Sequence, residues 1–245
     1  MCTVLFFPTK EGYYFASLRD ESPKRAKAKI PAVVNNDELS YLAPIDPLGG
    51  GSWVGVNENG SVIILLNGGF QTHIREKSYR KSRGLIVTEL LTKEMPVVEW
   101  SLMDMDGIEP YTLIIFDDGN LFQLVWDGAE KHRMLLENDK PYLWSSATLY
   151  DSSAQQIRND LFQNWIAMSP PITKLTVLNF LKSFENKEIG FLMNRNDSVQ
   201  TLSYSFIELL DDSEAVMSYY DLKDYIYHAS KIEMNRNCSN AKSQN

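Results

Sequence analysis

Four pairs of short apolar segments, each pair joined by a polar turn, most constrain the fold of this chain. The predicted hairpins join residues 2–7 to 12–18, 53–56 to 61–66, 112–116 to 121–126 and 203–210 to 215–220. Their turns include Asn57-Glu58-Asn59-Gly60 and Asp117-Asp118-Gly119-Asn120, which favour tight reversals of the chain. The strand at 61–66 is apolar on both faces, as expected for a strand that is covered on two sides.

Three segments instead have the apolar spacing of helices, and we predict that their apolar stripes face the core. The stripes are Ile86, Leu90 and Leu91 in 83–93; Ile157, Leu161, Trp165 and Met168 in 154–168; and Leu175, Leu178, Leu181 and Phe184 in 173–184. Ser152 and Ser153 are the predicted cap of the second helix. Residues 20–48 predict a long surface loop and 235–245 a polar tail. Without a repeat or linker, residues 1–234 predict one layered α+β domain.

Composition excludes several classes of protein. The net charge of −8 argues against a general nucleic-acid binder, because neutralising phosphates requires a basic surface. Cys2 and Cys238 provide no disulfide framework, and the first apolar run, 3–7, is too short for a signal sequence or a membrane span. We therefore expect a cytoplasmic protein with no integral membrane segment. The three histidines are scattered without metal-ligand spacing, so we expect neither a metal nor a cofactor.

Cys2 is the strongest candidate for catalytic chemistry. A small second residue permits removal of Met1, which leaves a thiol and a free α-amine on one residue. The sulfur can then attack a carbonyl while the amine, with a reference pKa near about 8, carries the proton. The alternative is that Cys2 is only a small residue in the second position.

Three further polar positions could support such a nucleophile. Arg19 could favour the thiolate and Asp20 could orient the terminal amine, although both also fit a solvated strand end. Asn67, followed by Gly68, could donate a hydrogen bond to an oxyanion, or it could simply be a turn residue.

In their order along the chain, these residues resemble one family. The matching segments are Met1-Cys2, Arg19-Asp20-Glu21, Gly50-Gly51-Ser52-Trp53-Val54-Gly55, Leu66-Asn67, Ser82-Arg83-Gly84-Leu85-Ile86-Val87 and, more weakly, Ser145-Ser146-Ala147 and Thr201-Leu202-Ser203. Together they are similar to the NRDE family, also called transport and Golgi organisation protein 2.

The resemblance implies an N-terminal-nucleophile hydrolase fold, a four-layer αββα sandwich of two antiparallel sheets between helical layers. It also implies a cysteine hydrolase that cleaves a non-peptide amide or acyl bond through a Cys2 thioester. Arg19 and Asp20 would support the nucleophile and Asn67 would help form the oxyanion hole. The expected substrate pocket would include Leu18, Trp53, Gly68, Ser146 and Leu202.

Three departures from the family pattern keep a second hypothesis open. Leu18 and Ser146 stand where the family has Asn, and Leu202 stands where it has Arg. Loss of one oxyanion donor typically lowers turnover by about 10²–10³. A non-catalytic binding or carrier protein for haem, acyl-CoA or another amphipathic ligand, as the family's links suggest, is therefore the alternative. A structural interaction protein is the third hypothesis, and no feature of the sequence favours it. The substrate and the oligomeric state are not encoded in a recognisable motif.

Overall fold

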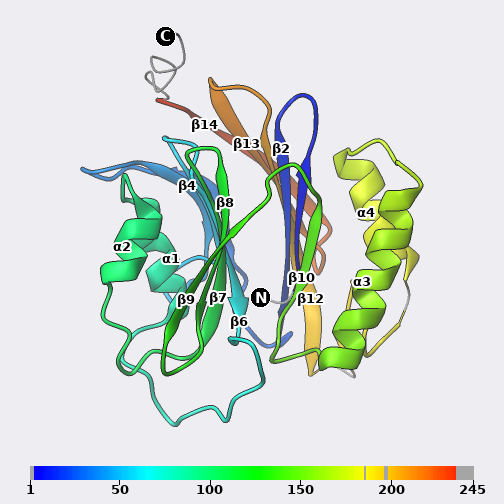
Figure 1. The fold of residues 1–245 in the computed structure, drawn as a ribbon, viewed down its shortest axis with the longest axis horizontal. Coiled ribbons are helices and arrows are strands. Elements are labelled where there is room, and N and C mark those ends of the chain that lie inside the picture. The colour runs from blue at the N-terminus through cyan, green and yellow to red at the C-terminus, as the bar shows by residue number, and fades with distance from the viewer. Residues whose placement is uncertain (1–2, 185, 196–197, 236–245) are drawn as a thin grey trace.

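Two antiparallel sheets face each other between two layers of helices (Figure 1). The computed structural model describes residues 3–184, 186–195 and 198–235. Helices α1 (Arg83–Leu91) and α2 (Pro96–Leu102) cover the outer face of one sheet. Helices α3 (Ser152–Ala167) and α4 (Lys174–Ser183) cover the outer face of the other. The four layers confirm the predicted α+β sandwich.

The sheet beneath α3 and α4 has its first strand at the N-terminus of the described chain. Its order is β10-β1-β2-β12-β13-β14, with β11 paired to β12. The strands are β1 (Thr3–Pro8), β2 (Tyr13–Glu21), β10 (Tyr142–Ser145), β11 (Asn194–Arg195), β12 (Val199–Leu209), β13 (Glu214–Asp221) and β14 (Ile226–Glu233).

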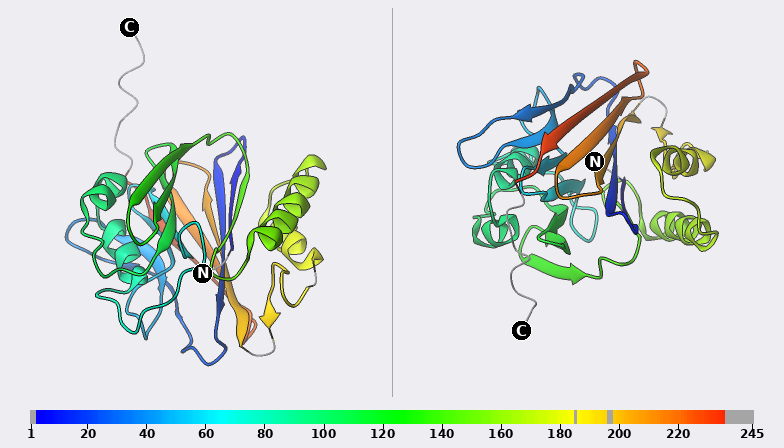
Figure 2. Two further views of the ribbon diagram at one scale, coloured as in Figure 1. Left: turned by 60° about the horizontal axis from the view of Figure 1, so that its bottom comes forward. Right: turned by 90° about the horizontal axis from the view of Figure 1, so that it is seen from above.

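The sheet beneath α1 and α2 is a meander, in which each strand pairs with the next in sequence, as Figure 2 shows from two further directions. Its strands are β3 (Lys29–Val34), β4 (Tyr41–Ile45), β5 (Val54–Asn57), β6 (Val62–Asn67), β7 (Tyr111–Asp117), β8 (Asn120–Trp126) and β9 (Lys131–Leu136). All four predicted hairpins are confirmed: β1–β2, β5–β6, β7–β8 and β12–β13 pair as antiparallel neighbours.

Alternation along β1 and β2 divides the side chains between two cores. Phe6 and Phe15 point between the sheets, where their ring centroids lie 6.4 Å and 5.7 Å from that of Phe116. Phe7 points the other way and packs under α3, with its centroid 5.9 Å from that of Phe162. Consecutive residues of these strands therefore point alternately into the space between the sheets and toward α3 and α4. Only every second residue of β2 faces the other sheet.

The predicted core face of α1 is confirmed, but those of α3 and α4 are partly wrong. Ile157 and Met168 are 41% and 71% exposed, whereas Arg158 is fully buried. Leu175 of α4 is 66% exposed. Apolar residues occur on more than one face of these two helices, so their spacing alone does not identify the buried face. The packing against the sheet decides it. The cap of α3 is also one residue earlier than predicted, since Asp151 accepts a 2.8 Å hydrogen bond from the N–H of Ala154.

The prediction of a long loop at 20–48 is wrong, because this segment contains β3 and β4. β3 is mostly apolar, but it contains Pro31 and is largely exposed at a sheet edge, so it lacks the alternation of apolar and polar residues that marks a half-buried strand. β9 and β14 escaped prediction because charged and polar residues interrupt their apolar ones.

No helix in the described ranges is long and apolar enough to cross a membrane. Apart from Asn235, the predicted tail at 235–245 lies outside the described residues. A single domain over 1–234 stays a prediction.

Candidate functional site

The predicted nucleophile, Cys2, lies outside the described residues, which begin at Thr3. Thr3 is fully buried and pairs with Leu18 of β2 on one side and with Ser145 of β10 on the other. The peptide bond to Thr3 keeps the Cα atoms of residues 2 and 3 about 3.8 Å apart. Groups that could assist a nucleophile at residue 2 must therefore lie close to Thr3.

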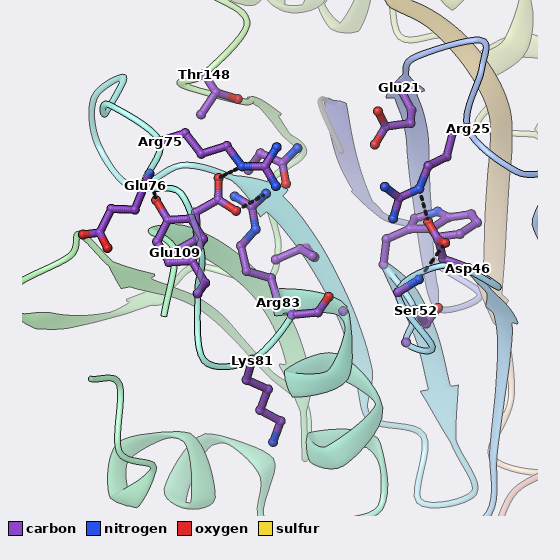
Figure 3. Close-up of a pocket in the computed structure, with 18 of the residues that line it drawn as sticks. Glu21, Arg25, Asp46, Ser52, Arg75, Glu76, Lys81, Arg83, Glu109 and Thr148 are labelled. Atoms are coloured by element: carbon purple, nitrogen blue, oxygen red, sulfur yellow. Dashed lines mark hydrogen bonds and ion pairs between the residues drawn. The ribbon is translucent and has the colours of Figure 1, made fainter. Parts of the chain in front are cut away.

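A cavity of about 880 Å³ receives residues from both sheets and from the long connection between β6 and α1 (Figure 3). Three predicted site residues line it, namely Arg19 of β2, Trp53 before β5 and Asn67 at the end of β6. Glu21 and Thr148 line it as well. These residues come from distant parts of the sequence, and the sheet sandwich brings them to one opening.

Arg19 is held in one position by a carboxylate and a ring. Its Nη2 atom lies 2.7 Å from Oδ2 of Asp46, and its guanidinium carbon lies 4.6 Å from the centroid of the Trp53 ring. Arg19 is only 4% exposed. A buried guanidinium that is paired and stacked in this way keeps a defined geometry.

Asp46 is the centre of the loop that supports Arg19. Burial acts to raise the pKa of Asp46, but hydrogen bonds from the Gly49 and Leu48 amides and from Arg25 outweigh it and hold the pKa below its usual value. The following glycines allow this tight loop. Gly50 has a φ of +69°, and a Cβ at Gly51 would lie 2.1 Å from the carbonyl carbon of Gly84. The Gly-rich segment therefore cradles a carboxylate and packs against α1.

Asp20 does not line this cavity. Since it follows Arg19 in the strand, its side chain lies on the helix-facing side of the sheet, where it accepts a 2.5 Å hydrogen bond from Oγ1 of Thr201 and one of 3.4 Å from the hydroxyl of Tyr150. Glu21, one residue further, returns to the cavity side. The sequence prediction missed Glu21, although strand alternation from Arg19 could have identified it.

Asn67 also lines a second cavity of about 460 Å³, together with Gly68 and Ser146. The Ser146 hydroxyl donates a 2.8 Å hydrogen bond to the backbone carbonyl of Asn67 and lies 2.9 Å from Oγ1 of Thr148. Gly68 has a φ of +84°, and a Cβ there would lie 2.9 Å from a methyl group of Thr148. Ser146 therefore fixes the backbone at the end of β6, between the two cavities.

Two residues expected in the substrate pocket line neither cavity. Leu18 is fully buried in the core beneath α3 and α4, and Leu202 is buried on β12. The apolar replacements of the family's Asn and Arg are thus packed inside the protein.

The opposite wall of the 880 Å³ cavity contains a cluster around Glu109 to which the sequence analysis assigned no role in the site. Oε2 of Glu109 lies 3.1 Å from Arg83, and its Oε1 lies 3.6 Å from Arg75 and 3.4 Å from His73 (Figure 3). Arg83 also donates to the carbonyl of Pro110 at 3.1 Å. In the parts of the chain that the structure describes, no group of three or more His, Cys, Asp or Glu residues is arranged to hold a metal ion.

Comparisons with known proteins identify the family and proteins of similar fold. Residues 1–230 match the model of a family described as Transport and Golgi organisation 2. No curated protein sequence matches the chain. A Caenorhabditis elegans orthologue of N-acylethanolamine-hydrolyzing acid amidase has a similar structure, with a TM-score of 0.57 and 10% identity over 84% of this chain and 92% of that chain.

Two variants of conjugated bile acid hydrolase from Clostridium perfringens are also similar. Both have a TM-score of 0.53, with 13% and 12% identity over 97% of this chain and 94% of theirs. At such identities the likeness concerns the fold, and it confirms the predicted N-terminal-nucleophile hydrolase fold.

Proposed function

Because the chain belongs to the Transport and Golgi organisation 2 family and has the fold of N-terminal-nucleophile hydrolases, we propose that it is a cysteine hydrolase. It cleaves a non-peptide amide or acyl bond through a thioester at Cys2, after removal of Met1. A cytoplasmic location, where the thiol stays reduced, is part of this proposal.

One observation carries the proposal: Arg19 and Asn67, from different sheets, line one cavity. Arg19 follows Leu18, the strand partner of Thr3, so the backbone of Arg19 lies one residue beyond the pair that begins β1. A fixed guanidinium there favours a thiolate over a thiol. The Asn67 amide can donate to the oxygen that becomes negative when sulfur attacks a carbonyl.

The steps follow from these groups. The sulfur of Cys2 attacks the carbonyl carbon, and the α-amine takes the thiol proton. The C–N bond of the amide breaks, and the leaving amine receives that proton. Water then attacks the thioester carbon with the α-amine as base, which releases the carboxylic acid and restores the thiol.

Intact mass after exposure to an activated acyl probe tests this function. We expect one added acyl group on the native protein and on Cys238→Ala, and none on Cys2→Ala. Retention of Met1 in protein from its native host, or equal labelling of Cys2→Ala, would exclude the mechanism.

A carrier for haem, acyl-CoA or another amphipathic ligand is the second candidate. It is favoured by the positions of Leu18 and Leu202, which line neither cavity, and by the bond from the Ser146 hydroxyl to the Asn67 carbonyl. At positions 18 and 202 the expected polar side chain is therefore replaced by leucine, and the hydroxyl of Ser146 is already bonded to the Asn67 carbonyl. Saturable changes in haem absorbance or in Trp fluorescence with acyl-CoA, without acylation of Cys2, would favour the carrier.

A further inference from the structure

The smaller cavity, of about 460 Å³, differs from the larger one in the charge of its lining. Charged residues make up 23% of the chain, but none is among the described residues that line the smaller cavity. Its polar lining consists of serine and threonine hydroxyls and of the amide side chains of Asn67, Gln123, Gln155, Gln156 and Asn159. A charged group of a ligand would find no opposite charge among these side chains, and burial of an unpaired charge costs free energy.

Two of these amides have defined orientations. The indole N–H of Trp144 donates a 2.9 Å hydrogen bond to Oε1 of Gln123. Because an indole can only donate, the Gln123 amide must turn its oxygen to Trp144, and its two N–H donors remain. Nε2 of Gln155 donates a 2.8 Å hydrogen bond to the carbonyl of Tyr150, so that its Oε1 remains as an acceptor. The lining therefore includes an oriented donor on β8 and an oriented acceptor on α3.

The strand β10 adds groups of both kinds. It is the outermost strand of its sheet and, among the described strands, pairs only with β1. Its residues Leu143, Trp144 and Ser145 line the smaller cavity. The outer edge of a sheet presents N–H and C=O groups that have no strand partner. A hydroxyl or an amide suits such a mixture because it both donates and accepts, whereas a carboxylate only accepts and an ammonium only donates.

We propose that the smaller cavity binds an uncharged polar group of the ligand, a hydroxyl or an amide, through hydrogen bonds with Gln123 and Gln155. Asn67 connects this cavity to the candidate site, because it lines both cavities. The inference rests on the proposed function for the position of the reacting bond, beside Asn67. It adds that the substrate is uncharged in the part that extends from this bond into the smaller cavity. Leu66 and the ring of Trp144 contact the aliphatic carbons of that part.

Binding to the Cys2→Ala variant tests the class of ligand without catalysis. Calorimetric titrations compare the N-hexanoyl derivatives of glycinamide, 3-aminopropane-1,2-diol, glycine and 1,2-diaminoethane, which end in an amide, hydroxyls, a carboxylate and an ammonium. We expect the better of the two uncharged ligands to bind about 10- to 100-fold more tightly than either charged one. The amide and the diol together show which uncharged group the cavity prefers.

A carboxylate placed in the cavity should reverse this preference. Gln123→Glu keeps the shape of the side chain and the acceptor for Trp144, but it replaces the two donors by an anionic oxygen. We expect this variant to bind the ammonium ligand more tightly than the uncharged ones. Gln155→Glu is the second variant if thermal melting shows that Gln123→Glu is not folded. Gln163→Glu, which is exposed on α3 and does not line the cavity, is the matched control and should keep the native preference.

Equal binding of charged and uncharged ligands, tighter binding of a charged one, or binding of none of the four would overturn the proposal. An unchanged preference in the folded glutamate variants of the cavity would overturn it as well. The proposed function depends instead on acylation of Cys2 in the native protein. A preference for uncharged ligands without that acylation would exclude the hydrolase and leave this binding site standing, and acylation without the preference would do the reverse.

Discussion

The guanidinium of Arg158 donates a 2.5 Å hydrogen bond to the hydroxyl of Thr3, across 155 positions of sequence. Arg158 lies on α3 and is fully buried, between the rings of Tyr150 and Phe191 at 4.0 Å and 4.5 Å. It also donates to Ser145 on β10 and to the carbonyls of Ile189 and Gly190. One side chain therefore ties the beginning of β1 to the helical layer behind it.

Replacing Arg158 by Met should lower the free energy of unfolding by about 2–4 kcal/mol. The substitution keeps the aliphatic stem but leaves several buried acceptors without their donor. Urea denaturation measures the change, and Lys182→Met, at the end of α4, is the matched control. A loss below about 0.5 kcal/mol, the range of ordinary surface substitutions, would show that Arg158 does not anchor this strand.

Asp20 and Glu21 should have separable roles despite being adjacent. Asp20→Asn should lower stability by about 1–3 kcal/mol, because the buried Thr201 hydroxyl bonds its carboxylate. Glu21→Gln should leave stability nearly unchanged and instead alter the rate of Cys2 acylation, since Glu21 lines the cavity. Thermal melting and acylation kinetics of both variants check the assignment, which fails if Asp20→Asn changes only the kinetics.

Asp46 should contribute to stability in a way that depends on pH. Its pKa is lower in the folded protein than the usual value of about 3.9, so its contribution is present above about pH 4. That contribution is lost as the pH falls through the folded-state pKa. Unfolding free energies from pH 3 to pH 7 should therefore show a gap between the native protein and Asp46→Asn that narrows toward low pH. A gap independent of pH would contradict the assigned shift.

Asn67→Ala should lower the rate of Cys2 acylation by about 10²–10³, the usual effect of losing an oxyanion donor. Single-turnover kinetics with an activated acyl probe measure the rate. Asn120→Ala, at the start of β8, provides the control because its side chain donates to the carbonyl of Asp118 in the adjoining turn, away from the cavity. Equal rates for the two variants would remove Asn67 from the oxyanion hole.

Gly51→Ala should be more destabilising than Gly119→Ala. At Gly51 a Cβ would overlap the backbone of Gly84 at the start of α1, whereas at Gly119 it would meet nothing within 4 Å. We expect a loss of about 1–3 kcal/mol or more at Gly51 from overpacking. At Gly119 we expect only the cost of its positive φ, about 1–2 kcal/mol. Chemical denaturation compares the two, and an equal loss would mean that the loop adjusts freely.

The hairpins were predictable because their signals are local. The turn at 57–60 and the apolar strand at 61–66 specify β5 and β6 whatever packs around them. Edge strands such as β3 and β14 lack that signal, because Pro31 interrupts β3 and polar and apolar residues are mixed along β14. The face of α3 was not predictable either, because only the contacts with Thr3 and Gly190 explain a buried arginine there.

The sequence by itself determined the layered sandwich, its hairpins and the family, because apolar periodicity, turn residues and ordered motifs are properties of neighbouring residues. Only the tertiary structure decided that Arg19 and Glu21 share the cavity with Asn67 while Asp20 faces the helices. It alone also brought Arg25 and Arg83, which are far apart in sequence, to opposite sides of that cavity (Figure 3). The physical reason is that strand alternation and sheet stacking set the direction of a side chain, and that direction depends on which partner covers each face.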